Sequence, residues 1–266
     1  MLNGVLGSTD QHLPDAARGS ANAAAPLAGL PLMSLIIPCY DEARTLPLLI
    51  RRIEESFTAE HQSEVVLVDN GSTDESPAIM ASLASHPFIR TVRVDVNQGY
   101  GYGILVGLRA ARGQFLGWTH ADMQADPADA LKALALIRDA NVAALYVKGQ
   151  RHGRPFQDIV FTLGMSFFET LLLRTPLWDI NAQPNIFSRP FYESVANDAP
   201  HDFSLDLYFY HAARQSHLPI LRFPVRFGER LHGLSHWNVD WPAKKRFIMR
   251  TVEFSLELRK RVSRAR

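Results

Sequence analysis

Three short polar clusters carry the residue types that could do chemistry in this chain. They occupy residues 40–42, 69–72 and 120–124 and bring together carboxylates, amides, a tyrosine, a serine and a histidine. Such side chains accept and donate hydrogen bonds, and the ionisable ones exchange protons. We expect a polar ligand to bind among them, because each cluster closely follows a short apolar run suited to a buried strand, at residues 33–38, 64–68 and 115–118.

The elements around these clusters alternate between strands and helices. The pattern predicts a further strand at 89–94 and helices over 43–57, 76–85 and 101–112. Asp41 is expected to cap the first of these helices. Alternation with short connections implies an α/β fold, with a mostly parallel sheet covered by helices on both faces. Ligands of such sheets bind beyond the carboxyl ends of the strands, so the three clusters should converge there.

The second half of the chain is less regular. An apolar helix is expected over 157–173 and a basic helix at the C-terminal end. The other expected elements are helices over 128–138 and 205–216, strands at 142–147 and 220–227, and a loop and strand at 179–189. No internal repeat or interdomain linker is found, which predicts one domain over residues 32–266. Residues 1–31 lack periodicity and are expected to form a disordered leader.

Composition excludes several classes of protein. The 266 residues are 47% hydrophobic and 21% charged, as in an ordinary globular protein, and the net charge of +1 gives no reason to expect a nucleic-acid partner. The single cysteine, Cys39, excludes a disulfide scaffold and a four-cysteine zinc site, and favours a cytoplasmic location. Residues 244–266 nevertheless hold nine basic and two acidic side chains. This basic end is either a solvated helix, which composition alone favours, or a contact with anionic lipid.

The apolar segment Ile159–Leu173 is the longest candidate for a membrane span. Glu169 and three hydroxyl residues interrupt it, and it is shorter than the roughly 20 residues that a bilayer crossing needs. The N-terminus also lacks a positive segment followed by an apolar run. The sequence therefore predicts neither a membrane span nor a signal peptide.

Several motifs together resemble the family 2 glycosyltransferases, most closely the dolichyl-phosphate-mannose-synthase-like branch. In chain order they are Ile37–Glu42, Val68–Asp74, Asn97–Gly99, His120–Pro127, Gly149–Arg151, Asp179–Arg189 and Arg230–Ser235. The resemblance implies a GT-A-type nucleotide-sugar-binding fold. It also implies an inverting transferase that moves a sugar from a UDP- or GDP-sugar to a polyprenyl-phosphate or cell-surface glycan acceptor.

By this resemblance, a first group of residues holds the donor nucleoside. The group comprises Pro38, Tyr40, Glu42, Asp69, Gly71, Ser72 and Ala121. Turn chemistry is an alternative for part of it, because Asp-Asn-Gly-Ser is common in any loop. That alternative weighs as much as binding for Gly71 and Ser72, but less for Asp69, which ends a buried strand.

The resemblance also implies a divalent cation, Mn²⁺ or Mg²⁺, on the donor diphosphate. Related enzymes carry Asp-x-Asp, whereas this chain has His120-Ala121-Asp122, with Gln124 as a further oxygen ligand. Imidazole suits Mn²⁺ better than Mg²⁺. Three readings follow: an enzyme that prefers Mn²⁺, a weakened site in which Asp122 and Gln124 suffice, or a degenerate transferase. We expect a working enzyme with altered metal preference, in which Asp122 is catalytic.

The acceptor side departs further from the family. The resemblance implies that Arg151 and Arg230 neutralise phosphate oxygens, that Asp179 braces the site and that Asn181 and Gln183 face the acceptor. Ser235 and His236 belong to the same group, although the branch has lysine in place of His236. It also has arginine where this chain has Gln157-Asp158, and Arg154 is a nearby substitute.

Asp206 is expected to be the general base if the acceptor is a hydroxyl. A phosphate acceptor is already ionised and needs no base. Alternatively, Asp206 only stabilises the first turn of a helix through the helix dipole.

Taken together, the sequence predicts a metal-dependent hexosyl-type transferase of polysaccharide biosynthesis. The apolar helix and the basic end would dock it on the cytoplasmic face of a membrane as a peripheral protein. A rival from another class is a catalytically degenerate nucleotide-sugar-binding or scaffold protein, for which His120 is the best argument. Against that rival stands the retention of five expected residues: Asp69, Asp122, Gln124, Asp206 and Arg230.

Overall fold

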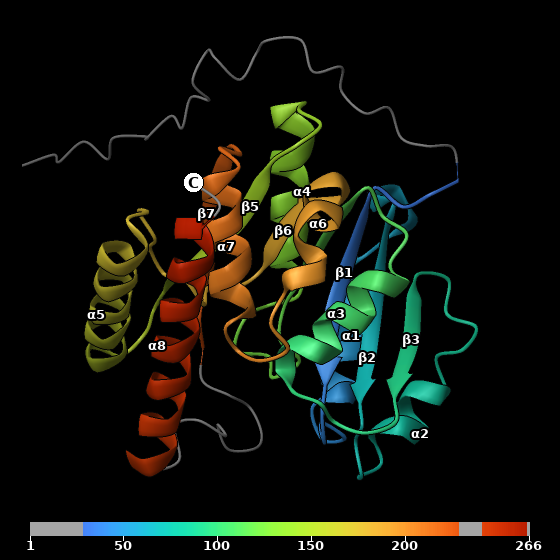
Figure 1. Ribbon diagram of the computed structural model, residues 1–266. Helices are drawn as coiled ribbons and strands as arrows, with labels where there is room; N and C mark the ends of the chain where they lie inside the picture. Colours follow the sequence, from blue (N-terminus) through green and yellow to red (C-terminus); the bar gives the residue numbers. More distant parts are fainter. Residues whose placement is uncertain (1–28, 229–240, 265–266) are drawn as a thin grey trace, which may run out of the picture.

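A seven-stranded sheet forms the centre of the computed structural model, which describes residues 29–228 and 241–264 (Figure 1). The strand order is β3-β2-β1-β4-β6-β5-β7, and β6 alone in this sheet runs antiparallel to its neighbours. The predicted α/β fold with a mostly parallel sheet is therefore confirmed. The strands are β1 (Met33–Cys39), β2 (Ser63–Asn70), β3 (Ile89–Val94), β4 (Phe115–Trp118), β5 (Tyr146–His152), β6 (Asn185–Ser188) and β7 (Ile220–Arg226).

Helices cover both faces of this sheet. The α-helices are α1 (Leu46–Ser56), α2 (Ser76–Ala81), α3 (Tyr100–Ala110), α4 (Asp129–Ala140), α5 (Phe156–Leu173), α6 (Arg189–Val195), α7 (Leu205–Gln215) and α8 (Trp241–Arg264), with short 3-10 helices at Ala59–His61 and Ala196–Asp198. In Figure 1, α5 lies outermost, beside α8 and away from the sheet.

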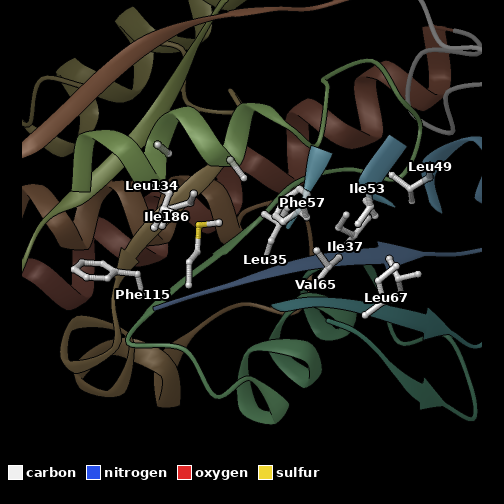
Figure 2. Packing of buried hydrophobic residues seen from close by; sticks show 14 of the residues in the cluster. Leu35, Ile37, Leu49, Ile53, Phe57, Val65, Leu67, Phe115, Leu134 and Ile186 are labelled. Atoms are coloured by element: carbon white, nitrogen blue, oxygen red, sulfur yellow. The ribbon is translucent and has the colours of Figure 1, made fainter. Parts of the chain in front are cut away.

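Alternate residues of the central strands belong to two apolar clusters, one on each face of the sheet. Leu35 and Ile37 of β1 pack with Leu49 and Ile53 of α1 on one face (Figure 2). Ile36, between them in sequence, packs on the other face with α3 and α7. Because both faces of β1 and β2 are buried, apart from the half-buried Pro38, the sequences of these strands are largely continuous apolar runs rather than alternating ones.

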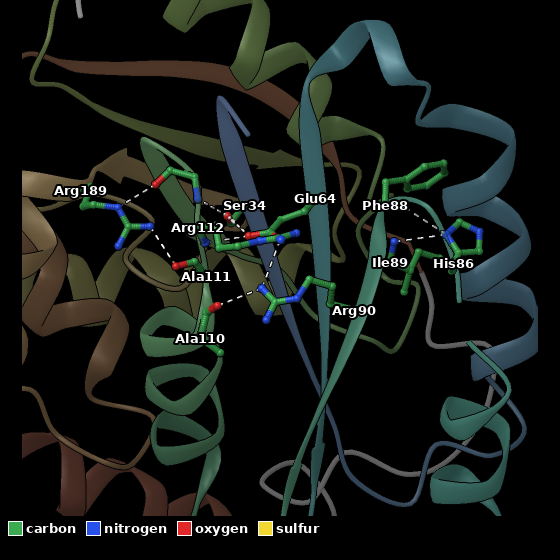
Figure 3. A network of polar contacts seen from close by, with 11 residues as sticks. Ser34, Glu64, His86, Phe88, Ile89, Arg90, Ala110, Ala111, Arg112 and Arg189 are labelled. Atoms are coloured by element: carbon green, nitrogen blue, oxygen red, sulfur yellow. Dashed lines mark hydrogen bonds and ion pairs between the residues drawn. The ribbon is translucent and has the colours of Figure 1, made fainter. Parts of the chain in front are cut away.

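A buried carboxylate, Glu64 of β2, connects the amino ends of β1 and β2 through hydrogen bonds. Glu64 accepts hydrogen bonds from Ser34 Oγ at 2.7 Å and from Arg112 Nη2 at 2.9 Å, and it pairs with Arg90 (Figure 3). Burial alone would raise the pKa of Glu64, but the hydrogen bonds from Ser34 and Arg112 outweigh burial and lower it. This network lies at the edge of the sheet opposite the predicted site, so we assign it to stability.

Two local expectations are wrong. Asp41 does not cap α1, which begins five residues later at Leu46; its backbone is left-handed (φ 52°) and its Oδ1 accepts the Thr73 N–H at 2.8 Å. The fifth strand runs from Tyr146 to His152 rather than ending at Val147. The predicted leader lies almost wholly outside the described residues, and the single-domain assignment stays a prediction.

The helix α5 is longer than the apolar segment Ile159–Leu173. It begins at Phe156 and has 18 residues, so by length and composition alone it is apolar enough to cross a membrane. Its buried residues are Ser166, Glu169 and Leu173, whereas most of its large apolar side chains are exposed. One such helix is weak evidence for a span. The exposure of these side chains does, however, show that the apolar surface of α5 faces away from the rest of the protein.

Candidate functional site

Two loops at the carboxyl edge of the sheet are hydrogen-bonded to each other. The Asp41 N–H donates to Ser72 Oγ and the Glu42 N–H donates to Ser76 Oγ, each at 3.0 Å. Gly71, at φ 77°, lets its loop approach the backbone of Asn97, where an added Cβ would lie 2.5 Å from the nitrogen. The first two sequence clusters therefore form one structural unit, as expected from parallel strands.

Asp69 is the buried carboxylate of this unit. Its Oδ1 accepts the Ser72 N–H at 2.9 Å, and its Oδ2 pairs with Arg93 at 2.7 Å. Pro38 lies in β1, and Tyr40 is exposed beside the turn. The Asp69 carboxylate thus shapes the turn, as the turn interpretation requires, and its nucleoside-binding role stays a prediction.

The third cluster follows β4 at the same edge. Asp122 is buried, and its Oδ1 accepts the Gln124 N–H at 3.1 Å. Gln124 Nε2 donates to the carbonyl of Gly228 at 3.2 Å, so the amide oxygen of Gln124 is not used in that bond. Ala121 is also buried. The loop that follows the short strand β4 therefore places Asp122 and Gln124 next to each other at this edge of the sheet.

Aromatic rings stack beside this cluster. The ring of Tyr100 stacks on His120, with centroids 5.5 Å apart, and on Phe203 at 4.7 Å. Gly101 makes this possible, because an added Cβ there would lie 2.7 Å from the carbonyl oxygen of Asp202. The glycines at the start of α3 therefore let the loop before α7 close over the helix.

A buried polar network adjoins the stack, and sequence reasoning missed half of it. Asp206 Oδ1 accepts hydrogen bonds from Gln183 Nε2 at 2.6 Å and from Asn185 Nδ2 at 2.7 Å. Asn185 Oδ1 in turn accepts from Lys148 Nζ at 2.7 Å. Asp206 and Gln183 were predicted site residues, whereas Asn185 and Lys148 were not. One signal was available in the sequence: Lys148 directly follows the apolar run of a predicted strand.

Burial opposes charge in this network. Burial raises the pKa of Asp206, although the positive charge of Lys148 acts to lower it. Burial also lowers the pKa of Lys148 to about 7, although the negative charge of Asp206 acts to raise it. Asp206 is 3% exposed and is enclosed by its donors. Its assignment as a general base stays a prediction.

Arg151 and Asp179 form a further buried pair. Arg151 Nη2 lies 2.5 Å from Asp179 Oδ1, and the Arg151 N–H donates to Oδ2 at 2.9 Å. Burial would raise the pKa of Asp179, but the charge and hydrogen bonds of Arg151 outweigh burial and lower it. Arg154 Nη2 is 3.7 Å from the same carboxylate, and Asn181 is exposed nearby. Asp179 thus braces Arg151, and two arginines surround one carboxylate.

The residues after β4 offer oxygen ligands that suit a divalent cation. Across the described ranges, no group of three or more His, Cys, Asp or Glu side chains is placed to bind a metal ion. Asp122 and the amide oxygen of Gln124 supply hard oxygen ligands, and Mg²⁺ or Mn²⁺ sites commonly combine one or two such ligands with substrate phosphates. His120 lies beside them, held by its stack on Tyr100.

Three predicted residues cannot be placed. Arg230, Ser235 and His236 lie in the segment 229–240, outside the described residues. Their assigned roles toward phosphate and acceptor stay predictions.

A family model agrees with this site. The model described as Glycosyl transferase family 2 matches residues 34–193, which is more than half of the chain. Curated relatives include the undecaprenyl-phosphate 4-deoxy-4-formamido-L-arabinose transferases of Pseudomonas fluorescens (36% identical over 106 residues) and Yersinia enterocolitica (27% over 128 residues). These matches cover 39% and 47% of this chain but only 31% and 39% of the relatives.

Solved structures share the fold. A mannosyltransferase from Pyrobaculum calidifontis, in complex with GDP-Man and Mn²⁺, has a TM-score of 0.56 and 23% identity over 80% of this chain and 59% of its own. Glucosyl-3-phosphoglycerate synthase from Mycobacterium tuberculosis, in complex with UDP, has a TM-score of 0.64 and 16% identity, covering 87% and 80%. At these identities the likeness concerns the fold alone, and it confirms the predicted GT-A type.

Proposed function

Because the chain belongs to glycosyl transferase family 2, as its motifs predicted, we propose that it transfers a sugar from a nucleotide sugar to a polyprenyl phosphate at the cytoplasmic face of a membrane. One observation carries the proposal. The family match includes Asp69, Asp122 and Arg151, which belong to the carboxyl ends of β2 and β5 and to the loop after β4, all at one edge of the sheet.

The donor nucleoside binds at the paired loops after β1 and β2. Tyr40 is exposed there, Glu42 lies on one of the two hydrogen-bonded loops, and Asp69 ends β2 and accepts the Ser72 N–H of the other loop. Carboxylates accept hydrogen bonds from the base or the ribose. Because these loops are held by their own hydrogen bonds, the nucleoside meets a site that is already formed.

A divalent cation is held by Asp122 and Gln124, with His120 beside them. When bound, it neutralises negative charge on the donor diphosphate. The relatives solved with Mn²⁺ support a divalent cation for the fold, and the imidazole of His120 supports a preference for Mn²⁺ over Mg²⁺ in this chain. Asp122 also orders its own loop through the Gln124 N–H.

The acceptor phosphate binds near Arg151 and Arg154. The Arg154 side chain is 8% exposed, and its Nε–H has no hydrogen-bond partner among the described residues. A buried donor without a partner is costly, and an anionic oxygen would satisfy it. The phosphate oxygen attacks the anomeric carbon in line, a new carbon–oxygen bond forms, and the bond to the nucleoside diphosphate breaks with inversion. Such an acceptor needs no base, which suits the enclosed position of Asp206.

The helices α5 and α8 support the membrane location. The most exposed apolar side chains of α5 are Phe156 at 77%, Phe167 at 67% and Leu171 at 63%. Arg259 and Lys260 are exposed on the neighbouring α8. An apolar surface beside basic side chains is typical of a helix pair that lies in the interface of an anionic bilayer. The Arg151–Arg154 segment leads directly into α5, so the acceptor phosphate and its lipid tail would meet adjoining surfaces.

A thermal-shift panel of UDP-, GDP- and dTDP-sugars, with Mn²⁺, with Mg²⁺ and with chelator, tests the donor side. One nucleotide sugar should raise the melting temperature by roughly 5 °C at about 100 times its Kd, and only with metal. Asp122→Asn should abolish the metal-dependent part while keeping an oxygen for the Gln124 N–H.

Asp126→Asn is the matched control, because Asp126 lies on the same loop but pairs with Arg52 of α1 and should retain the shift. A shift that is indifferent to metal would contradict the cation site. Binding without transfer in every assay would favour the rival, a degenerate nucleotide-sugar-binding protein.

A further inference from the structure

Lys148 is a buried lysine that the donor, cation and acceptor sites do not use. Its side chain is fully buried, and Nζ donates to the Ala182 carbonyl and to Asn185 Oδ1, each at 2.7 Å. It lies opposite Asn185 in the β5–β6 register and faces α7, with Nζ 5.4 Å from the centre of the Tyr210 ring. Buried lysines are rare unless they are paired, so this one requires an explanation.

Lys148 fixes the orientation of the Asn185 amide. Asn185 Oδ1 accepts from Lys148 and from Tyr146 Oη, at 2.7 Å and 3.1 Å. The amide nitrogen must then point the other way, where it donates to Gln183 Oε1 at 3.0 Å and to Asp206 Oδ1 at 2.7 Å. Asn185 is therefore a bridge between a cation and a carboxylate.

The hydrogen bonds suit the ionised form of both end groups. Lys148 Nζ donates to two oxygens, and Asp206 Oδ1 accepts two amide N–H bonds, from Gln183 and Asn185. The other charged groups around Lys148 have partners of their own. Arg222 of β7 donates to the Trp178 and Gly149 carbonyls, and Asp179 pairs with Arg151. His120 stacks on Tyr100, whose hydroxyl lies 3.4 Å from Asp206 Oδ2.

We propose that Lys148 is a positioning residue: with Asp206 it forms an amide-bridged charge pair that holds Gln183 and Tyr100 in place behind His120. The connection to the site is direct. Gln183 Nε2 donates to Asp206 at 2.6 Å and lies 3.4 Å from Tyr100 Oη, and the Tyr100 ring stacks on His120, two residues before Asp122. The proposal rests on the proposed function, because it concerns the geometry of that same site.

The position of the pair predicts which kinetic constant changes. Lys148 acts behind β4, whereas the nucleoside loops after β1 and β2 are fastened by their own hydrogen bonds. Loss of Lys148 should displace His120 and its neighbours by fractions of an ångström and leave the nucleoside loops intact. The effect should therefore fall on kcat rather than on the donor KM.

Four variants test the proposal: Lys148→Met, Asp206→Asn, the double variant, and Tyr146→Phe, which removes the other donor to Asn185 Oδ1 without changing charge. Removing one member of a buried charge pair leaves the other unpaired, whereas removing both is often nearly neutral. Each single charge variant should lower Tm by at least about 5 °C, and the double variant should recover most of that loss.

In the transfer assay, Lys148→Met should lower kcat by about 10- to 100-fold with the donor KM changed by less than about threefold, and Tyr146→Phe should retain most activity. If the Tm losses of the two single variants simply add in the double variant, the charge pair is overturned. If Lys148→Met has the same kcat as Tyr146→Phe, the positioning role is overturned. The comparison of Tm values needs no substrate, so it tests the charge pair whether or not the protein is active. Absence of transferase activity in the wild-type protein would count against the proposed function alone.

Discussion

The central strands of the sheet and the outer helix α5 differ in which side chains they leave exposed. In the sheet, Val66 and Leu67 are fully buried, and the charged groups at the strand ends are paired. In the helix pair, Glu169 of α5 is fully buried against Ser255 of α8, while Phe167 is 67% exposed. The sheet is therefore organised for water outside and apolar packing inside. On α5 the large apolar side chains face outward instead, whereas α8 exposes charged side chains such as Arg259 and Lys260.

The largest predicted contrast is in stability. Leu67→Ala leaves a cavity in the core of the sheet and should lower the free energy of unfolding by about 3 kcal/mol. Leu171→Ala, the same substitution on the exposed face of α5, should change it by less than about 0.5 kcal/mol. Denaturant unfolding of both variants measures this directly. An equal loss in the two would mean that α5 is packed in solution, contrary to its exposure.

The second contrast concerns membranes. Phe167→Glu combined with Leu171→Glu should weaken binding to vesicles by at least about 100-fold, because burial of each large apolar side chain contributes about 1.5–3 kcal/mol. Leu48→Glu is the matched control, because Leu48 is 43% exposed on α1, away from the helix pair. Vesicle sedimentation compares the two. The membrane assignment fails if the α1 variant loses as much binding as the α5 variant.

The third prediction uses the buried carboxyl between α5 and α8. Burial raises the pKa of Glu169 to about 7, and the hydrogen bond from Ser255 only partly opposes this. Between about pH 4.5 and 7 the folded state holds a proton that the unfolded state has lost, so stability falls as pH rises through that window. The total is of the order of 3 kcal/mol.

Glu169→Gln should remove this pH dependence and unfold at a higher temperature than wild type at pH 8. Thermal unfolding of both proteins across the window checks the sign. A wild-type profile that rises between pH 4.5 and 7, with the variant following it, would show that Glu169 is ionised in the folded protein.

The smallest effect concerns the basic end of α8. Lys260→Gln should weaken binding to anionic vesicles about fivefold at low salt, since one basic side chain near such a surface contributes roughly 1 kcal/mol. The difference should disappear at high ionic strength, where charges are screened. Unchanged binding at low salt would mean that this helix end is merely solvated, which is the interpretation that composition favours.

Much of the fold could be predicted from the sequence because its strongest signals are local. Continuous apolar runs marked the buried strands, and the polar clusters after them marked the edge where the site forms. Lys148 was missed because a lysine normally indicates exposure, and the predicted strand ended just before it. Its burial depends on Asn185 and Asp206, which are distant in sequence and reach it only through β6 and α7.

The burial pattern of α5 could not be predicted either. Its composition indicated an apolar helix, but the burial of its two polar residues depends on distant partners: Ser255 of α8 for Glu169, and the Asp179 N–H for Ser166. The role of Asp41 changed for a similar reason. Its carboxylate is hydrogen-bonded by Thr73 from the next loop rather than by the helix that follows it.

The most direct test of the account is transfer of a labelled sugar to undecaprenyl phosphate in anionic vesicles, from the nucleotide sugar that thermal shift selects, with Mn²⁺ or with chelator. Wild-type protein should form a lipid-linked sugar only with metal, and Asp122→Asn should reduce the rate by at least about 1,000-fold, in line with the loss of a central electrostatic group. Asp126→Asn should stay near the wild-type rate. A lipid-linked product formed equally by wild type and Asp122→Asn, or no product from a donor that binds, would contradict the account.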